Sequence, residues 1–169
     1  GQALASGGSS GQAEVVAAVR KGLLPRAAVF TPNLAEAEAF TGRVVNHRDS
    51  MVAAARTLLE MGPSAVMITG GHLIDADPAD AANSPDLVLV EGSEPVWLES
   101  PRLGIRHTHG TGCVLSAAIC AGLGLGLPVL EACRQGKNFV TRAIAAGVDL
   151  GAGDGPVDPH FVDPASERL

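Results

Sequence analysis

The segment with the clearest chemical potential is 107–113, HTHGTGC, which an apolar helical pattern follows directly. Gly110 and Gly112, on either side of Thr111, let backbone N–H groups turn toward one point, and the helix N-terminus adds the positive end of its dipole. Such a loop suits an anion, for example a phosphoryl group during its transfer. Cys113 would lie in the first helical turn, where the same field favours the thiolate. The alternative is a glycine-rich helix entry with a small buried cysteine, and the residues alone do not decide between the two.

A second segment, 31–38 (TPNLAEAE), follows a short apolar run. Asn33 and Glu36 are three residues apart, so their oxygens could face one way and hold a hydrated Mg²⁺, a hard ion that prefers oxygen ligands. An asparagine N-cap followed by acidic residues in the first turn of a helix would give the same pattern. The residues alone favour this second, structural interpretation.

The third segment is 68–72 (ITGGH), at the end of another apolar run. Ligands of α/β proteins gather at the carboxyl ends of strands. Gly70 and Gly71, directly after Thr69, would let the backbone approach a nucleotide closely. A tight turn explains the same residues, and the sequence by itself favours the turn.

These segments need strands and helices that alternate along the chain. Strands are expected at 27–30, 65–68, 86–91 and 95–99, the last two as a pair around Gly92. Helices are expected at 13–23, 34–40, 51–61 with Ser50 as its cap, 113–123 and 129–147, and loops at 1–10 and 75–85. The alternation predicts an α/β fold with a parallel or mixed sheet covered by helices, in which 27–30 and 65–68 are neighbouring buried strands. With no internal repeat and no long linker, we expect one domain over residues 1–169.

Composition limits the partners and the compartment. The net charge of −6 argues against nucleic acid, whose phosphates select basic surfaces, but does not exclude ATP, which needs only a few local donors and a metal. Cys113, Cys120 and Cys133 form no CxxC pair, so we expect neither a disulfide framework nor a zinc site, and a cytoplasmic setting is the simplest. Cys120 and Cys133 lie in apolar helical stretches and are expected to pack. No apolar run has the length that spans a membrane.

All three segments occur in the same order in one family. The chain resembles hydroxymethylpyrimidine/phosphomethylpyrimidine kinase, a member of the ribokinase superfamily. The stretches that carry the resemblance are TPNLAEAEAFTG (31–42), VMITGGHL (66–73), HTHGTGCVLSAAICAGLGLG (107–126) and GAGDGPV (151–157). The resemblance implies a layered ribokinase-like α/β sheet flanked by helices. It also implies transfer of the ATP γ-phosphoryl group to the hydroxymethyl group of 4-amino-5-hydroxymethyl-2-methylpyrimidine, or to its monophosphate, in thiamine biosynthesis.

The resemblance further implies roles for individual residues. Gly110, Thr111 and Gly112 would form the anion hole together with Cys113. Cys113, in the place of the superfamily's catalytic Asp, would act as the base toward the substrate hydroxymethyl group. Glu36 would be the metal ligand, on the Mg²⁺ and phosphate side of the site. The residues expected to contact the nucleotide are Asn33, Glu36, Thr69, Gly70, Gly71 and His109.

Two features depart from the family's pattern. The residue before the glycine pair is often a lysine that reaches the phosphates, and Thr69 stands there in this chain, which removes a cation. The family's N-terminal region, which holds a glycine-rich substrate segment and several central strands, is missing. Because a chain without those strands would expose a sheet edge, we expect a fragment, a truncated gene product, or a chain completed in a homodimer or by a partner chain that supplies the missing part.

Two other functions stay open on the sequence. One is pyridoxal kinase, because members of this group overlap in substrate. The other is a non-catalytic remnant that binds nucleotide or a partner subunit, which Thr69 and the missing region favour and the intact Cys113 loop and Glu36 oppose. The string GAGD at 151–154 carries the catalytic Asp in sugar kinases of the superfamily. Here Gly-Pro follows it instead of a helix, so we expect a C-terminal loop.

Overall fold

The computed structural model of the protein describes residues 9–71, 73, 82–104, 109–147 and 155–161. The chain divides into two compact units, residues 1–102 and residues 103–169, and each is described by itself. Several of the sequence predictions fall outside the described residues, namely those for 1–8, His72, 75–81, His107, Thr108 and the GAGD string at 151–154.

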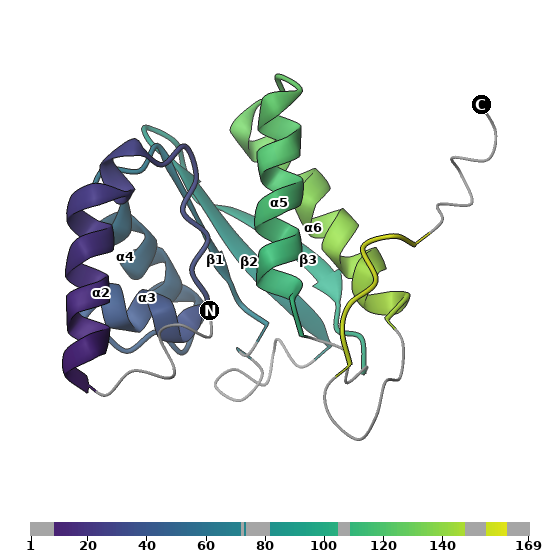
Figure 1. The fold of residues 1–169 in the computed structure, drawn as a ribbon, viewed down its shortest axis with the longest axis horizontal. Coiled ribbons are helices and arrows are strands. Elements are labelled where there is room, and N and C mark those ends of the chain that lie inside the picture. The colour runs from purple at the N-terminus through teal and green to yellow at the C-terminus, as the bar shows by residue number, and fades with distance from the viewer. Residues whose placement is uncertain (1–8, 72, 74–81, 105–108, 148–154, 162–169) are drawn as a thin grey trace. The chain divides into compact units, whose positions relative to one another are not determined.

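The first unit (residues 1–102) is built on three antiparallel strands in the order β1-β2-β3 (Figure 1). They are β1 Ala65–Thr69, β2 Asn83–Val90 and β3 Val96–Pro101. The predicted pairing of the last two strands is confirmed, and Gly92 in the turn between them has a φ of 73°, which favours glycine. β2 begins before the predicted Asp86, because its pairing with β3 reaches back to Asn83 opposite Pro101.

The segment 27–33 lies parallel to β1 on the edge opposite β2, which makes the pairing mixed as predicted. Isolated bridges join Phe30 to Val66 and Asn33 to Thr69, and the Met67 N–H donates to the Phe30 carbonyl at 2.8 Å. The prediction that 27–30 and 65–68 are neighbours is therefore confirmed. The prediction of a buried strand at 27–30 is wrong, because the segment makes isolated bridges only and its side chains are half-buried or exposed. Within the described residues, the segment 27–30 pairs with a neighbour on one edge only. Four apolar residues in a sequence do not reveal whether a strand has one neighbour or two.

The helices of the first unit follow the predicted order with shifted ends. They are α2 Ser9–Gly22, the 3₁₀-helix η1 Leu24–Arg26, α3 Leu34–Thr41 and α4 Arg48–Leu59. α3 and α4 pack against each other and against β1, and α4 also packs against β2 (Figure 1). α2 begins at Ser9, inside the stretch that was expected to be a loop.

The N-cap of α4 differs from the predicted Ser50. Ser50 is the third residue of the helix, and His47 is its N-cap. The two residues cap each other: the Ser50 N–H donates to His47 Nδ1 at 3.2 Å, and the His47 N–H donates to Ser50 Oγ at 3.0 Å. The prediction of Ser50 as the cap was wrong because histidine is not among the usual capping residues, whereas serine is.

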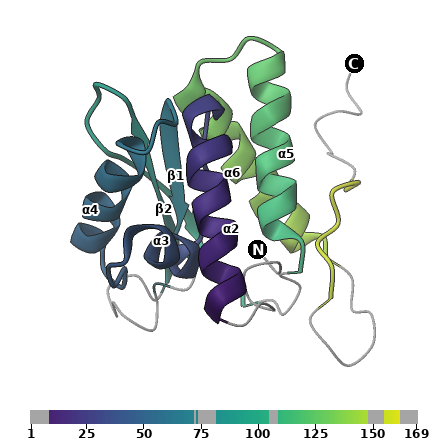
Figure 2. The same ribbon diagram turned by 60° about the vertical axis from the view of Figure 1, so that its left-hand side comes forward.

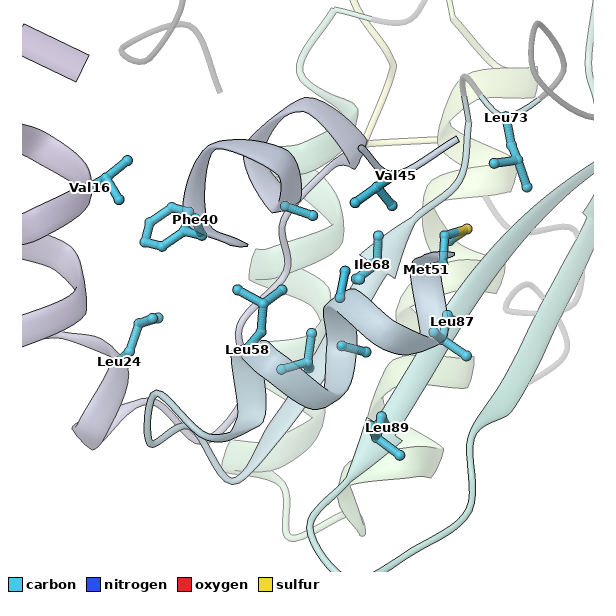
Figure 3. Packing of buried hydrophobic residues seen from close by; sticks show 14 residues of the cluster. Val16, Leu24, Phe40, Val45, Met51, Leu58, Ile68, Leu73, Leu87 and Leu89 are labelled. Atoms are coloured by element: carbon cyan, nitrogen blue, oxygen red, sulfur yellow. The ribbon is translucent and has the colours of Figure 1, made fainter. Parts of the chain in front are cut away.

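One hydrophobic core joins these helices to the sheet. Phe40 of α3, Leu58 of α4 and Ile68 of β1 all belong to this cluster of buried residues, which Figure 3 shows from close by. Leu58 and Ile68 are fully buried, and burial of one such side chain stabilises a fold by about 1.5–3 kcal/mol. At the start of α4, the guanidinium of Arg48 stacks 4.5 Å from the centre of the Trp97 ring of β3, which is partly buried against the core. The core therefore fixes the positions of α3 and β1, whose ends carry the predicted site residues of this unit.

The second unit (residues 103–169) contains α5 Thr111–Gly124 and α6 Val129–Ala145, which lie side by side (Figure 2). The helices pack closely at Gly136, where an added Cβ would lie 2.7 Å from Ile119 Cγ1.

Cys133 of α6 is fully buried, and burial raises its pKa to about 11, so its thiol stays neutral and the predicted packing role is confirmed. The same prediction for Cys120 is wrong, because Cys120 is exposed on α5. Although α5 carries no charged residue, neither it nor any other described helix is long and apolar enough to cross a membrane.

Candidate functional site

The start of α3 holds the two residues that were predicted to lie on the metal side. Asn33 is the N-cap of α3, and its Oδ1 accepts the Glu36 N–H at 2.8 Å. In return, Glu36 Oε2 accepts the Asn33 N–H at 3.0 Å. This reciprocal capping box confirms the structural interpretation of the pair. Both side chains are half-buried, and the box holds them in one fixed arrangement at the end of the helix.

The end of β1 holds the predicted glycine turn. β1 ends at Thr69, opposite Asp86 of β2, and Pro85 is the next residue on that strand. Gly70 cannot carry a side chain, because an added Cβ would lie 2.0 Å from the Pro85 carbonyl oxygen. Its N–H donates to the buried carboxylate of Asp86 at 2.9 Å. The absence of a side chain at Gly70 is thus explained by the neighbouring strand, whereas Gly71 has open space where its Cβ would be.

These two groups of residues lie next to each other in the first unit. The Thr69 N–H donates to the Pro32 carbonyl at 3.0 Å, and the bridge between Asn33 and Thr69 continues this pairing to the first turn of α3. The start of α3 and the carboxyl end of β1 therefore meet at one end of the sheet. The structure brings together the predicted residues Asn33, Glu36, Thr69, Gly70 and Gly71.

The second unit brings together the predicted residues around the start of α5. Gly110 is the N-cap, with a φ of 91° that favours glycine, and it offers no side chain to cap the helix. Within the part of the chain that the structure describes, the N–H groups of Gly112 and Cys113 have no acceptor. Cys113 is exposed in the first turn of α5. This contradicts the alternative interpretation of the segment as a glycine-rich helix entry with a small buried cysteine. The helix entry therefore offers backbone donors without an acceptor in the described residues, which an anion-binding loop requires, and an exposed thiol lies beside them.

A contact that the sequence did not predict supports this loop from the side. His109 pairs in parallel with Pro156: the Val157 N–H donates to the His109 carbonyl at 3.2 Å, and the His109 N–H donates to the Gly155 carbonyl at 3.4 Å. The same tail is tied to α6, because the Asp158 N–H donates to the Ala143 carbonyl at 3.0 Å. The only signal in the sequence was the resemblance over 151–157, since backbone pairing between distant loops leaves no residue pattern.

The described residues contain no group of three or more His, Cys, Asp or Glu side chains that could hold a metal ion. Glu36 is a single carboxylate beside the amide oxygen of Asn33. A hydrated Mg²⁺ keeps several of its waters and usually binds through one or two carboxylates and substrate phosphates, so this donor set fits that ion.

Comparison with known proteins adds to this geometry. The family described as phosphomethylpyrimidine kinase matches residues 3–158, which includes both groups of site residues. The chain belongs to this family. A hydroxymethylpyrimidine/phosphomethylpyrimidine kinase of Streptomyces coelicolor is 48% identical over 140 residues, which are 83% of this chain and 49% of that protein. The corresponding kinase of Haemophilus influenzae is 39% identical over 147 residues, 87% of this chain and 54% of that protein. The chain thus spans about half the length of these curated relatives.

Solved structures agree with the ribokinase-like α/β fold. The pyridoxal kinase of Staphylococcus aureus in complex with AMP-PCP is 34% identical, with a TM-score of 0.80, over 87% of this chain and 52% of that one. The phosphomethylpyrimidine kinase of Clostridium difficile 630 is 28% identical, with a TM-score of 0.60, over 81% of this chain and 50% of that one. The predicted family and fold class are confirmed.

The glycine pair of this phosphomethylpyrimidine kinase family member allows a matched test. Gly70→Ala would place a Cβ against the Pro85 carbonyl, so we expect the free energy of unfolding to fall by about 1–3 kcal/mol, as for overpacked sites. Gly71→Ala enters open space and should change it by less than about 0.5 kcal/mol. Urea unfolding followed by circular dichroism measures both. Equal losses in the two variants would contradict the close approach of β2 to Gly70.

Proposed function

We propose that this chain forms the ATP-binding and phosphoryl-transfer part of a hydroxymethylpyrimidine/phosphomethylpyrimidine kinase. Its substrates would be ATP and the hydroxymethylpyrimidine or its monophosphate, as in the names of its relatives. The observation that carries the proposal is the start of α5, where Gly112 and Cys113 present backbone donors without an acceptor in the described residues. These donors would stabilise the negative charge that spreads over the phosphoryl group during transfer.

Cys113 is the residue that we propose as the base. Its thiol is exposed in the first turn of α5, whereas Cys133 is buried with a raised pKa and is unsuited to take a proton from a substrate. The Cys113 thiolate would accept the proton of the substrate hydroxymethyl group as that oxygen attacks the γ-phosphorus of ATP, while the bond from this phosphorus to the β–γ bridging oxygen breaks and ADP leaves. The Gly110–Cys113 backbone would hold the transferred group in line, and His109 at the entry of the loop would contact the nucleotide.

The first unit would contribute the nucleotide and metal side. Thr69, Gly70 and Gly71 lie at the carboxyl end of β1, where nucleotides bind in many α/β proteins. Glu36 would hold a hydrated Mg²⁺ with Asn33 beside it, and this ion would neutralise charge on the ATP phosphates. The related pyridoxal kinase of Staphylococcus aureus has been solved with AMP-PCP and with ADP, which supports ATP as the phosphoryl donor.

A second candidate function is pyridoxal kinase. The observation that favours it is the structural likeness to the Staphylococcus aureus pyridoxal kinase, with a TM-score of 0.80. The curated pyrimidine kinases of Streptomyces coelicolor and Haemophilus influenzae, at 48% and 39% identity against 34% for this pyridoxal kinase, favour the first candidate. Both candidates use an exocyclic hydroxymethyl group on a six-membered aromatic ring, so the proposed roles of Cys113 and the α5 loop are the same in each.

The two candidates are separated by an assay of acceptor preference. We expect ATP-dependent phosphorylation of the hydroxymethylpyrimidine with a kcat/KM at least about tenfold above that for pyridoxal, which corresponds to about 1.4 kcal/mol of transition-state discrimination. The assay is run on the chain and on a chimera that joins it to the part of the Streptomyces coelicolor kinase that it does not match. Mass spectrometry detects the products. Preference for pyridoxal would support the second candidate, and no turnover by the chimera would contradict both.

Replacement of Cys113 tests the proposed base. Cys113→Ala should lower kcat by about 10²- to 10⁴-fold, the usual contribution of a general base, and leave the affinity for Mg-ATP nearly unchanged. Cys113→Asp should restore part of the loss, because a carboxylate can also accept the proton. Cys120→Ala is the matched control, since Cys120 is exposed on the same helix outside the loop. Near-full turnover by Cys113→Ala would leave α5 as an anion site without a base.

Replacement of Glu36 separates capping from metal binding. Glu36→Gln keeps an oxygen that can accept the Asn33 N–H, so we expect a loss of less than about 1 kcal/mol in unfolding free energy. It removes the carboxylate charge, so the Mg²⁺ concentration for half-maximal turnover should rise about tenfold or more. Glu38→Gln on the same helix is the control, because the carboxylate of Glu38 accepts the Val45 N–H at 2.8 Å and has no proposed role in catalysis. An unchanged Mg²⁺ dependence in Glu36→Gln would contradict the metal role.

A further inference from the structure

Arg102 reaches across the end of the sheet in the first unit. It directly follows β3, and its backbone N–H donates to the Ala82 carbonyl at 3.0 Å, beyond the last β2–β3 pair. Its side chain makes two more hydrogen bonds: Nη2 donates to the Asn83 carbonyl at 3.0 Å, and Nη1 donates to the Gly71 carbonyl. One half-buried guanidinium thus connects the end of β3, the start of β2 and the turn that follows β1.

The other backbone groups of this turn are also held. The Gly70 N–H donates to the Asp86 carboxylate, which is 4% exposed, and the Gly70 carbonyl accepts the Leu73 N–H at 2.9 Å. The Gly71 carbonyl is held by Arg102. Among the described residues, the N–H of Gly71 is the one polar backbone group of the pair that has no hydrogen-bond partner. The other polar backbone groups of the glycine pair are therefore hydrogen-bonded, and one N–H donor is available to a ligand.

Without these hydrogen bonds, the Gly70-Gly71 pair would leave the Gly71 N–H poorly oriented. Glycine samples more backbone conformations than any other residue, so a Gly-Gly turn without side-chain bonds would spend little time in one binding-competent form. The apparent affinity of a site falls in proportion to the fraction of molecules in that form. The planar guanidinium of arginine, with several donors at fixed angles, is suited to bridge two carbonyl oxygens at once.

We propose that Arg102 is a positioning residue for the nucleotide site: by bridging the Gly71 and Asn83 carbonyl oxygens, it orients the Gly71 N–H toward a phosphate of bound ATP. Arg102 does not touch the reacting atoms, and its effect acts through the turn. The inference rests on the proposed function, because it takes the carboxyl end of β1 as the place where ATP binds.

The test compares Arg102→Ala and Arg102→Lys with a matched control, Arg48→Ala. Arg48 also braces β3, through its 2.7 Å ion pair with Glu99 and its stacking on Trp97, and neither of these partners belongs to the glycine turn. The readouts are the Kd for Mg-ATP by calorimetry, and kcat and both KM values in the phosphorylation assay. Circular dichroism establishes the folded fraction of each variant, so that values are compared per folded molecule.

We expect Arg102→Ala to raise the Kd and the KM for ATP about tenfold, with kcat and the KM for the alcohol within about twofold, because the competent form of the turn becomes rarer. Arg102→Lys should be intermediate, since its ammonium can donate to either carbonyl but lacks the rigid fork. Arg48→Ala should leave the KM for ATP unchanged. An ATP affinity in Arg102→Ala equal to that of Arg48→Ala would overturn the inference alone. Absence of Mg-ATP binding by the unmodified protein would instead overturn the proposed function, and this inference with it.

Discussion

The pairing of β1 on both of its edges is the constraint on which the first unit depends. Four of the five residues of β1 are fully buried, with the segment 27–33 in parallel on one side and β2 antiparallel on the other. Because backbone groups in a buried strand must all find partners, neither neighbour can shift its register without leaving groups unpaired. The bridge from Asn33 to Thr69 then places the first turn of α3 at the end of β1. The candidate nucleotide side is a direct product of this register.

In the second unit, backbone groups alone form the candidate site. Its candidate anion site consists of N–H groups at a helix start, and their direction is set by the positive φ of Gly110 and by the pairing of His109 with Pro156. Backbone donors fixed in this way need no reorganisation when charge develops on a ligand, which is the physical advantage of such sites. The close packing of α5 on α6 at Gly136 holds the helix whose first turn carries these donors.

Features that depend on neighbours in the sequence were predictable, and features that depend on distant partners were not. The capping pair Asn33 and Glu36 and the glycine at the start of α5 follow from residue types at fixed spacing, and both are found. The exposure of Cys120 depends on which face of α5 meets α6, and an uncharged helix gives no sign of it. The bonds of Arg102 join residues 19 and 31 positions apart, so no local pattern records them. The residues that could do chemistry were therefore readable in the sequence, whereas the contacts that hold them in place required the fold.

The position of Trp97 has a practical consequence for spectroscopy. The chain contains one tryptophan and no tyrosine, and Trp97 lies on β3 against the core of the first unit. Tryptophan fluorescence therefore originates in the first unit, whereas α5 and α6 of the second unit contribute to the far-ultraviolet circular dichroism. Tryptophan emission follows the surroundings of Trp97, whereas ellipticity follows the helices of both units. A single denaturation experiment with both detectors would thus resolve whether the two units melt together or in sequence.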